Sequence, residues 1–131
     1  MKRLLPALLL LAPAAMAEPY DKPWAIVATD ATLPPDARLR PVVISRIDGE
    51  ANTRREAVVE PGQRIVTVDL PPRAGVKLGT QGNLELQANP CMRYFIAAKP
   101  DATGQAWQPV VRAAESIGDC LVKFKGGVNA R

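Results

Sequence analysis

The chain contains only two cysteines, Cys91 and Cys120, and they lie at the outer ends of two strand-like runs. The runs at 92–99 and 107–117 flank a polar turn region that reads Pro-Asp-Ala-Thr-Gly-Gln. An antiparallel hairpin would bring its two outer ends together. Because two cysteines in a secreted chain most simply pair with each other, we predict a disulfide between Cys91 and Cys120.

A structural disulfide explains these cysteines better than thiol chemistry does. Their spacing is not that of a Cys-x-x-Cys redox motif, and the chain has no histidine to complete a zinc site. A bridge across this loop would stabilise the fold by roughly 3.5 kcal/mol in the loop-entropy description. That is a large share of the roughly 5–15 kcal/mol by which domains are stable.

Residues 1–17 have the pattern of a signal peptide. Two basic residues precede an apolar run at 4–12, and Ala15-Met16-Ala17 forms a small-x-small cleavage site before Glu18. The apolar run is too short to span a bilayer, and no later stretch reaches the roughly 20 residues required. Glu18 stands where a lipid-anchored protein would carry a cysteine. We therefore predict a periplasmic or secreted protein without a membrane anchor.

Cleavage would leave residues 18–131, a length that suits a single domain with one core. Without Lys2 and Arg3 the basic residues fall from 17 to 15 against 13 acidic residues, which gives a net charge of +2. They are mostly scattered singly rather than gathered on a stripe with interleaved aromatic residues. The charge distribution therefore predicts no nucleic-acid partner.

Other strand signals are short apolar or alternating runs between turn residues. They lie at 24–29, 41–47, 55–60, 64–70 and 84–88, with a last short strand at 121–124. Trp24, Ile26 and Ala28 share one face of the first strand, and Leu84, Leu86 and Ala88 face inward in the fifth. The Gly-rich segment 75–82 is interpreted as a connection.

The clearest local pattern is a hairpin around Pro61-Gly62. Pairing 55–60 with 64–70 about this dipeptide sets Ala57 opposite Val66. One face of the pair is then apolar and the other polar, as a half-buried antiparallel sheet requires.

The hairpin bounded by the cysteines has two different arms. The first arm is apolar on both faces, with Met92, Tyr94, Ile96 and Ala98 on one face and Phe95 and Ala97 on the other, which predicts a strand that is either central or covered. In the second arm one face is expected to hold Trp107, Val111, Ala113 and Ile117. Pro109 predicts an edge position for this arm. Residues 113–117 fit either a strand or a helical turn.

No segment sustains a 3.6-residue apolar period over three turns. Short strands separated by turn signals indicate an all-β fold, and the 11 of 13 prolines that follow residue 17 lie mostly at the strand boundaries. We predict a single immunoglobulin-like or prealbumin-like antiparallel β-sandwich of about seven strands, preceded by the signal peptide.

No set of residues carries an evident catalytic site. The absence of histidine excludes Ser-His-Asp and Cys-His arrangements, and neither Ser45 nor Ser116 lies in a nucleophile elbow. Asp48-Gly49 resembles the start of a calcium loop, but the later ligand positions do not fit, so it is interpreted as a turn. Trp107, Tyr94 and Tyr20 would suit a carbohydrate platform, although burial in a core accounts for them better. We predict no catalytic residue, metal or cofactor.

Residues 47–68 also resemble a known group of proteins. Ile-Asp-Gly at 47–49 is followed by Val-Val-Glu-Pro-Gly-Gln-Arg-Ile-Val-Thr-Val at 58–68. This rhythm resembles that of PEGA-like modules, small β-sandwiches akin to carboxypeptidase-regulatory and prealbumin-like domains of bacterial envelope proteins. Segments 90–98 and 107–111, with Cys120, are similar to uncharacterised secreted proteins of Gram-negative bacteria. The resemblance implies a binding or scaffolding role and no catalytic residues.

Two functions from different classes follow. The first is a non-catalytic periplasmic or secreted binding or scaffolding module whose partner is an envelope protein or glycan. The second is a small secreted enzyme or enzyme inhibitor with a site built from dispersed carboxylates, such as Glu115 and Asp119, and arginines, such as Arg93 and Arg112. A contiguous exposed apolar patch would favour the first, and a concave pocket holding two carboxylates the second.

Overall fold

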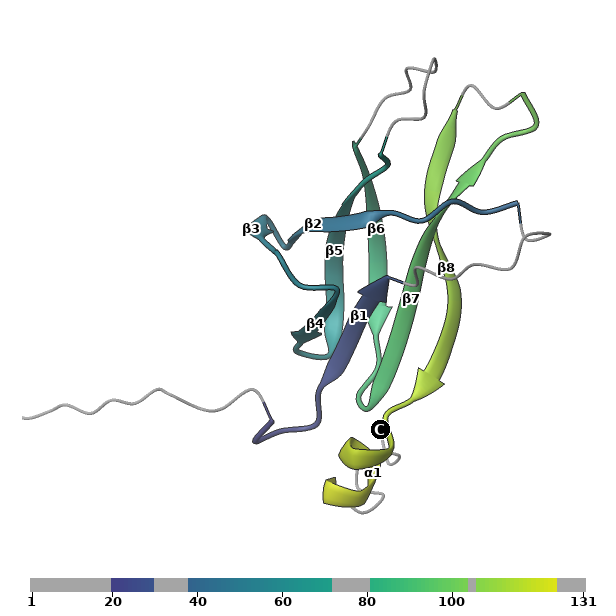
Figure 1. Ribbon diagram of the computed structural model, residues 1–131. Coiled ribbons are helices and arrows are strands. Elements are labelled where there is room, and N and C mark those ends of the chain that lie inside the picture. The colour runs from purple at the N-terminus through teal and green to yellow at the C-terminus, as the bar shows by residue number, and fades with distance from the viewer. Residues whose placement is uncertain (1–19, 30–37, 72–80, 104–105, 125–131) are drawn as a thin grey trace, which may run out of the picture.

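A computed structural model describes residues 20–29, 38–71, 81–103 and 106–124 (Figure 1). In this part of the chain two four-stranded sheets pack face to face, and a short helix follows the last strand. The predicted all-β sandwich is therefore confirmed. The predicted signal peptide and cleavage site lie outside the described residues.

Each sheet combines strands that are distant in sequence. The first sheet has the order β4 (Glu56–Val59), β1 (Ala25–Thr29), β7 (Met92–Pro100) and β8 (Trp107–Ser116). The second has the order β3 (Glu50–Ala51), β2 (Val43–Ile47), β5 (Gly62–Asp69) and β6 (Gln81–Ala88). The pair β1–β7 is parallel and the other strand pairs are antiparallel.

The main core lies between the two sheets and follows the period-two alternation of their strands. Ala25 and Val27 of β1 face Val66 and Val68 of β5, and all four are fully buried. Leu86 and Ala88 of β6 are buried in the same core, with Leu84 packed against it, as the alternation in 84–88 predicts.

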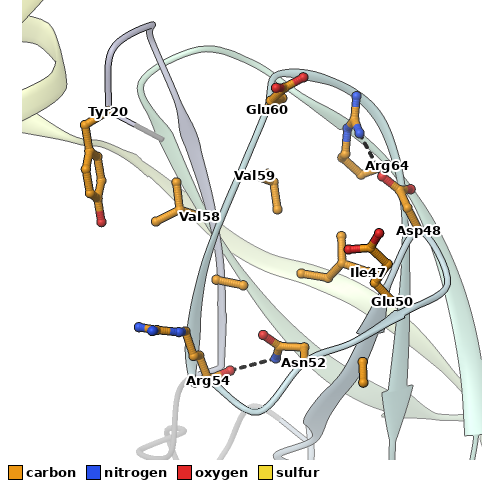
Figure 2. A pocket seen from close by; sticks show the side chains of 12 residues that line it. Tyr20, Ile47, Asp48, Glu50, Asn52, Arg54, Val58, Val59, Glu60 and Arg64 are labelled. Carbon is orange, nitrogen blue, oxygen red and sulfur yellow. Dashed lines mark hydrogen bonds and ion pairs between the residues drawn. The ribbon is translucent and has the colours of Figure 1, made fainter. Parts of the chain in front are cut away.

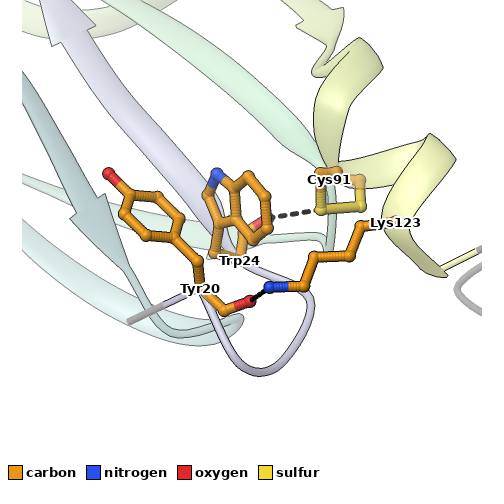
Figure 3. Close-up of a disulfide and its surroundings, with 5 residues drawn as sticks. Tyr20, Trp24, Cys91 and Lys123 are labelled. Carbon is orange, nitrogen blue, oxygen red and sulfur yellow. Dashed lines mark hydrogen bonds between the residues drawn. A yellow bond between two sulfur atoms is a disulfide. The ribbon is translucent and has the colours of Figure 1, made fainter. Parts of the chain in front are cut away.

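A second apolar cluster covers the outer face of the first sheet near helix α1 (Gly118–Phe124). It contains Trp24, Ile26 and Ala28, which share the face predicted for them, together with Ile117 and both cysteines. Cys91 and Cys120 form the predicted disulfide, with 5.3 Å between their Cα atoms (Figure 3). The bridge fastens α1 to the turn before β7.

The hairpin of β7 and β8 is also confirmed. Its antiparallel register runs from Met92 opposite Ser116 to Pro100 opposite Trp107. Of the two placements predicted for it, β7 has the central one, between β1 and β8, and β8 is an edge strand as predicted. Because β8 continues to Ser116, residues 113–116 are strand rather than a helical turn.

The predicted hairpin around Pro61-Gly62 is wrong. Residues 56–59 pair with β1 in the first sheet, whereas residues 62–69 pair with β2 and β6 in the second. The chain crosses between sheets at Glu60-Pro61, so Ala57 and Val66 lie in different sheets and are not paired. Alternation of apolar and polar residues indicates which face of a strand is buried, but it does not indicate which strand pairs with it.

The shared face predicted for the second arm is also wrong. Phe95 pairs with Ala113 and Ile96 with Val111, so Arg112 is an extra residue in β8. An extra residue exchanges the faces of all later side chains. Trp107 therefore packs on the main core, whereas Ile117 belongs to the outer cluster.

Two further boundaries differ from the prediction. Residues 121–124 form the last turns of α1 and not a strand, with Asp119 in the first turn and Lys123 in the last, where each charge suits the helix dipole. Strand β6 begins at Gln81, so Gly82 lies in a strand and not in a connection. The described part of the chain has no helix long and apolar enough to cross a membrane.

Candidate functional site: the open side of the sandwich

The sandwich has two sides, each with one edge strand from each sheet, β6 and β8 on one side and β3 and β4 on the other, and these sides differ in packing. On the side of β6 and β8, Trp107 and Pro109 lie directly against Gly82. A Cβ atom on Gly82 would be 3.0 Å from the Trp107 ring and 3.2 Å from the Pro109 ring. Glycine permits this approach, and any larger residue would force the two rings to shift. This side of the sandwich is therefore closed.

The side of β3 and β4 contains a cavity of about 790 Å³, here called the open-side cavity (Figure 2). Its apolar lining residues are Ile47, Ala51, Ala57, Val58 and Val59. Its charged and polar lining residues are Asp48, Glu50, Asn52, Arg54, Glu60 and Arg64, and Tyr20 completes the lining. The lining comes from both sheets and from the loop that joins β3 to β4.

Strand β4 presents both of its faces to the open-side cavity. Val59 points toward Ile47, and both pack against the main core between the sheets (Figure 2). Val58 points the opposite way, toward Tyr20, and packs against the outer cluster. Because residues on both faces line one hollow, the outer edge of β4 lies in that hollow.

The backbone groups on this edge can be assigned from the ladder with β1. The N–H of Thr29 donates to the carbonyl of Arg55 at 3.1 Å, and Ala28 pairs with Glu56. In an antiparallel ladder the bonded pairs alternate. The N–H and C=O groups of Glu56 and Val58 therefore point away from β1, and no strand among the described residues pairs with that edge.

The turn between β2 and β3 forms one wall of the cavity. Asp48 and Gly49 have φ angles of 52° and 85°, and Ile47 pairs with Glu50 across them. Two central residues with positive φ define a type I′ hairpin turn, for which Asp-Gly is a preferred sequence. The interpretation of Asp48-Gly49 as a turn is confirmed.

The Asp48 carboxylate fastens this turn to β5. One oxygen accepts the backbone N–H of Ile65 at 2.8 Å, and the other accepts an N–H of Arg64 at 2.7 Å. The hydrogen bond from Ile65, and then the one from Arg64, hold the pKa of Asp48 below its usual value, although partial burial acts in the opposite direction. Asp48 is thus a fixed, ionised structural group.

The loop between β3 and β4 is held by Asn52. Its side-chain amide donates to the carbonyls of Ile44 and Arg54, each at 2.8 Å (Figure 2). The first bond ties the loop to β2, and the second fixes the backbone that carries the Arg54 guanidinium. Arg54 thus lies near the beginning of β4, and Glu60 directly follows its end.

The concave pocket with carboxylates, named above as the sign of an enzyme, is present, but its acids are poorly arranged for catalysis. Asp48 is held ionised by Arg64 and Ile65. Glu50 and Glu60 are exposed to water, whereas a general acid at neutral pH needs burial or a close carboxylate partner. In the described ranges no three His, Cys, Asp or Glu residues are grouped to hold a metal ion.

The residues expected to build an enzyme site lie elsewhere. Arg93 forms an ion pair with Glu115 at 2.9 Å and lies 3.9 Å from Glu56, on the outer face of the first sheet. Arg112 stacks over the Phe95 ring on the same face at 5.8 Å. Asp119 begins α1. None of the residues Arg93, Arg112, Glu115 and Asp119 lines the open-side cavity.

The three aromatic residues do not form a platform. Tyr94 is buried in the main core, and its hydroxyl accepts the N–H of Asn89 at 2.8 Å. Trp107 packs against the same core, so burial explains both residues as predicted. Tyr20 is exposed, so the burial predicted for it is wrong. It contacts Trp24 edge-on, with 4.7 Å between the ring centroids.

Together the fold and this site define a disulfide-bonded β-sandwich with one closed side and one open side. No protein-family model, curated protein or solved structure matches the chain. The resemblance of residues 47–68 to PEGA-like modules thus stays a sequence-based proposal.

Proposed function

We propose that the protein is a non-catalytic binding module of the bacterial envelope and that it contacts another envelope component through the open-side cavity. The observation that carries this proposal is the concave cavity of about 790 Å³, lined by apolar residues together with charged and polar ones, beside the edge of β4 that no other described strand pairs with. Apolar concave sites with a few polar groups are where proteins usually bind ligands.

The location in the proposal rests on two features. Residues 1–17 have the pattern of a signal peptide, and disulfides such as Cys91–Cys120 persist in oxidising compartments. The PEGA-like rhythm of residues 47–68 adds an expected binding or scaffolding role, although a fold by itself does not fix a function.

The proposal is tested by site-specific photo-crosslinking in cells. A photoreactive residue replaces Glu50 or Glu60, both exposed on the rim of the cavity, or Glu85 or Gln87, both exposed on β6. We expect the two rim positions to capture one common partner and the two β6 positions to capture none. Equal capture from both pairs, or no capture from the rim, would overturn the proposal.

One observation favours an enzyme as a second candidate. The open-side cavity holds the carboxylates of Asp48, Glu50 and Glu60 within one concave site. If the protein hydrolyses an envelope substrate there, Glu50→Gln or Glu60→Gln should abolish turnover while the thermal unfolding midpoint stays unchanged. Such a result would overturn the binding proposal in favour of an enzyme. Absence of turnover by the unsubstituted protein as well as by both variants would exclude the enzyme.

A further inference from the structure

We propose that the partner is an extended peptide segment that adds to the first sheet as a strand antiparallel to β4, with alternate apolar side chains entering the open-side cavity. This inference rests on the proposed function, because it names the class of partner that the same site accepts. Strand addition of this kind uses main-chain hydrogen bonds for affinity and side-chain pockets for specificity.

The backbone of β4 is prepared for such a partner. Glu56 and Val58 direct an N–H and a C=O each toward the open side, which follows from the ladder with β1. Exposed edges are normally protected by proline, lysine, an inward charge or a bulge. The strand Glu56–Val59 contains no proline, lysine or bulge, and its inward side chains are the apolar residues Ala57 and Val59. Its protections are its length of four residues and the exposed Glu56 at its start.

The opposite edge of the same sheet shows the contrast. Strand β8 contains Pro109 and the extra residue Arg112, and it packs against β6 through Trp107. Proline and a bulge are two of the usual protections against strand addition. The first sheet is therefore protected at β8 and available at β4.

The cavity lies where an added strand would lie. Neighbouring strands are about 4.8 Å apart, so a strand beside β4 would occupy the hollow that both faces of β4 line. Side chains opposite Ala57 and Val59 would enter between the sheets toward Ile47. The alternate side chains would lie on the other face, near Val58 and Tyr20 (Figure 2). The site thus fits apolar residues at positions i and i+2.

The charges at the two ends of β4 set the order of charges expected in an antiparallel peptide. Glu60 directly follows β4, and Arg54 lies shortly before it. An antiparallel peptide would place its N-terminal end beside Glu60 and its C-terminal end beside Arg54. A basic residue first and an acidic residue last would then each meet an opposite charge.

The test uses the capped peptide acetyl-Lys-Val-Thr-Val-Thr-Glu-amide and the purified disulfide-bonded protein, observed by NMR. In the free protein the amide protons of Ala57 and Val59 should exchange slowly, because they are bonded to β1, and those of Glu56 and Val58 quickly. The peptide should slow the exchange of Glu56 and Val58. A peptide with Lys and Glu interchanged should bind more weakly.

Two variants at one position separate backbone pairing from side-chain packing. Val58→Pro removes the outward N–H, and proline is tolerated where the N–H of an edge strand faces solvent. Val58→Thr keeps the N–H and the branched shape. We expect Val58→Pro to weaken peptide binding by roughly tenfold or more relative to Val58→Thr. The exchange measurement on the unsubstituted protein holds even if Val58→Pro fails to fold.

Several outcomes would overturn strand addition. They are failure of the peptide to protect Glu56 and Val58, equal binding by the two Val58 variants, or a dimer in sedimentation that protects these amides without peptide. If crosslinking from Glu60 then still captures a partner, for example a glycan, the proposed function stands and strand addition fails. If the rim captures nothing, the proposed function fails as well.

Discussion

The carbonyl oxygen of Trp24 accepts a hydrogen bond of 2.6 Å from the backbone N–H of Cys91. The sulfur of Cys120 lies 3.7 Å from the same oxygen. One carbonyl group thus marks the point where the residue before β1, the turn before β7 and helix α1 meet. Lys123 of α1 donates to the carbonyl of Tyr20 at 2.6 Å and adds a second link.

Loss of the disulfide should therefore destabilise the whole domain and not only α1. The bridge closes a separation of 29 residues, for which the loop-entropy relation gives about 3.5 kcal/mol. We expect the Cys91→Ala/Cys120→Ala variant to lose about that free energy of unfolding in urea. Reduced unsubstituted protein is the control. Two titratable thiols in unfolded, unreduced protein, or an unchanged stability, would contradict the prediction.

Replacement of Asp48 should separate its charge from its backbone conformation. Asp48→Asn keeps an oxygen for the N–H of Ile65 and tolerates the φ angle of 52°. Since the ion pair with Arg64 is partly exposed, we expect a loss below about 1 kcal/mol. Asp48→Ala should cost roughly 1–2 kcal/mol more, because alanine resists a positive φ and leaves the N–H without its acceptor.

The same carboxylate should contribute to acid sensitivity. Its folded-state pKa is lowered, so its stabilisation is fully present above the unfolded-state pKa of about 4 and is lost as the pH falls through the folded-state pKa. The stability difference between the unsubstituted protein and Asp48→Asn should thus be present at neutral pH and shrink below about pH 4. Urea titrations at several pH values measure it, and a difference that grows on acidification would refute this role.

Alternation predicted the faces of strands well and their neighbours poorly. The inward face of β6 was readable because Leu84, Leu86 and Ala88 alternate with polar residues at a period of two. The shared face of Trp24, Ile26 and Ala28 was readable too, but β1 is buried on both faces, so the period did not tell which face is inward. The partner of β4 was not readable, because Ala57 and Val59 fit the core equally well beside β5 or across from it. The extra residue Arg112 likewise leaves no sequence signal, yet it exchanges the faces of Ala113 and Ile117.

The candidate site could not be predicted for the same reason. Its lining residues come from the segments at 20, 47–54, 57–60 and 64. They surround one cavity only because the chain passes from the first sheet to the second at Glu60-Pro61, which the sequence pattern does not indicate. The Asp48-Gly49 dipeptide predicts a turn, but no sequence pattern indicates that a cavity lies beside this turn. The sequence names Arg93 and Glu115 as candidate site residues, but they form an ion pair on the outer face.

Export can be tested directly. Because residues 1–17 have the pattern of a signal peptide, N-terminal sequencing of the exported protein should begin at Glu18. The variant Ala15→Asp removes a small residue of the cleavage site and should accumulate as uncleaved precursor. An exported protein that begins at Met1 would contradict this prediction.

The closed side of the sandwich should not tolerate a side chain at Gly82. A Cβ atom there would lie 3.0 Å from the Trp107 ring and 3.2 Å from Pro109. Since Trp107 packs against the main core and Pro109 is part of β8, a shift of either ring should be costly. Overpacking of this kind costs about 1–3 kcal/mol. Gly118→Ala is the matched control, since a Cβ atom on Gly118 meets nothing within 4 Å and lies at the start of α1. We expect Gly82→Ala to lower the urea midpoint and to change Trp fluorescence, and Gly118→Ala to leave both nearly unchanged; equal stability of the two variants would show that the β6–β8 side is looser than the packing of Trp107 indicates.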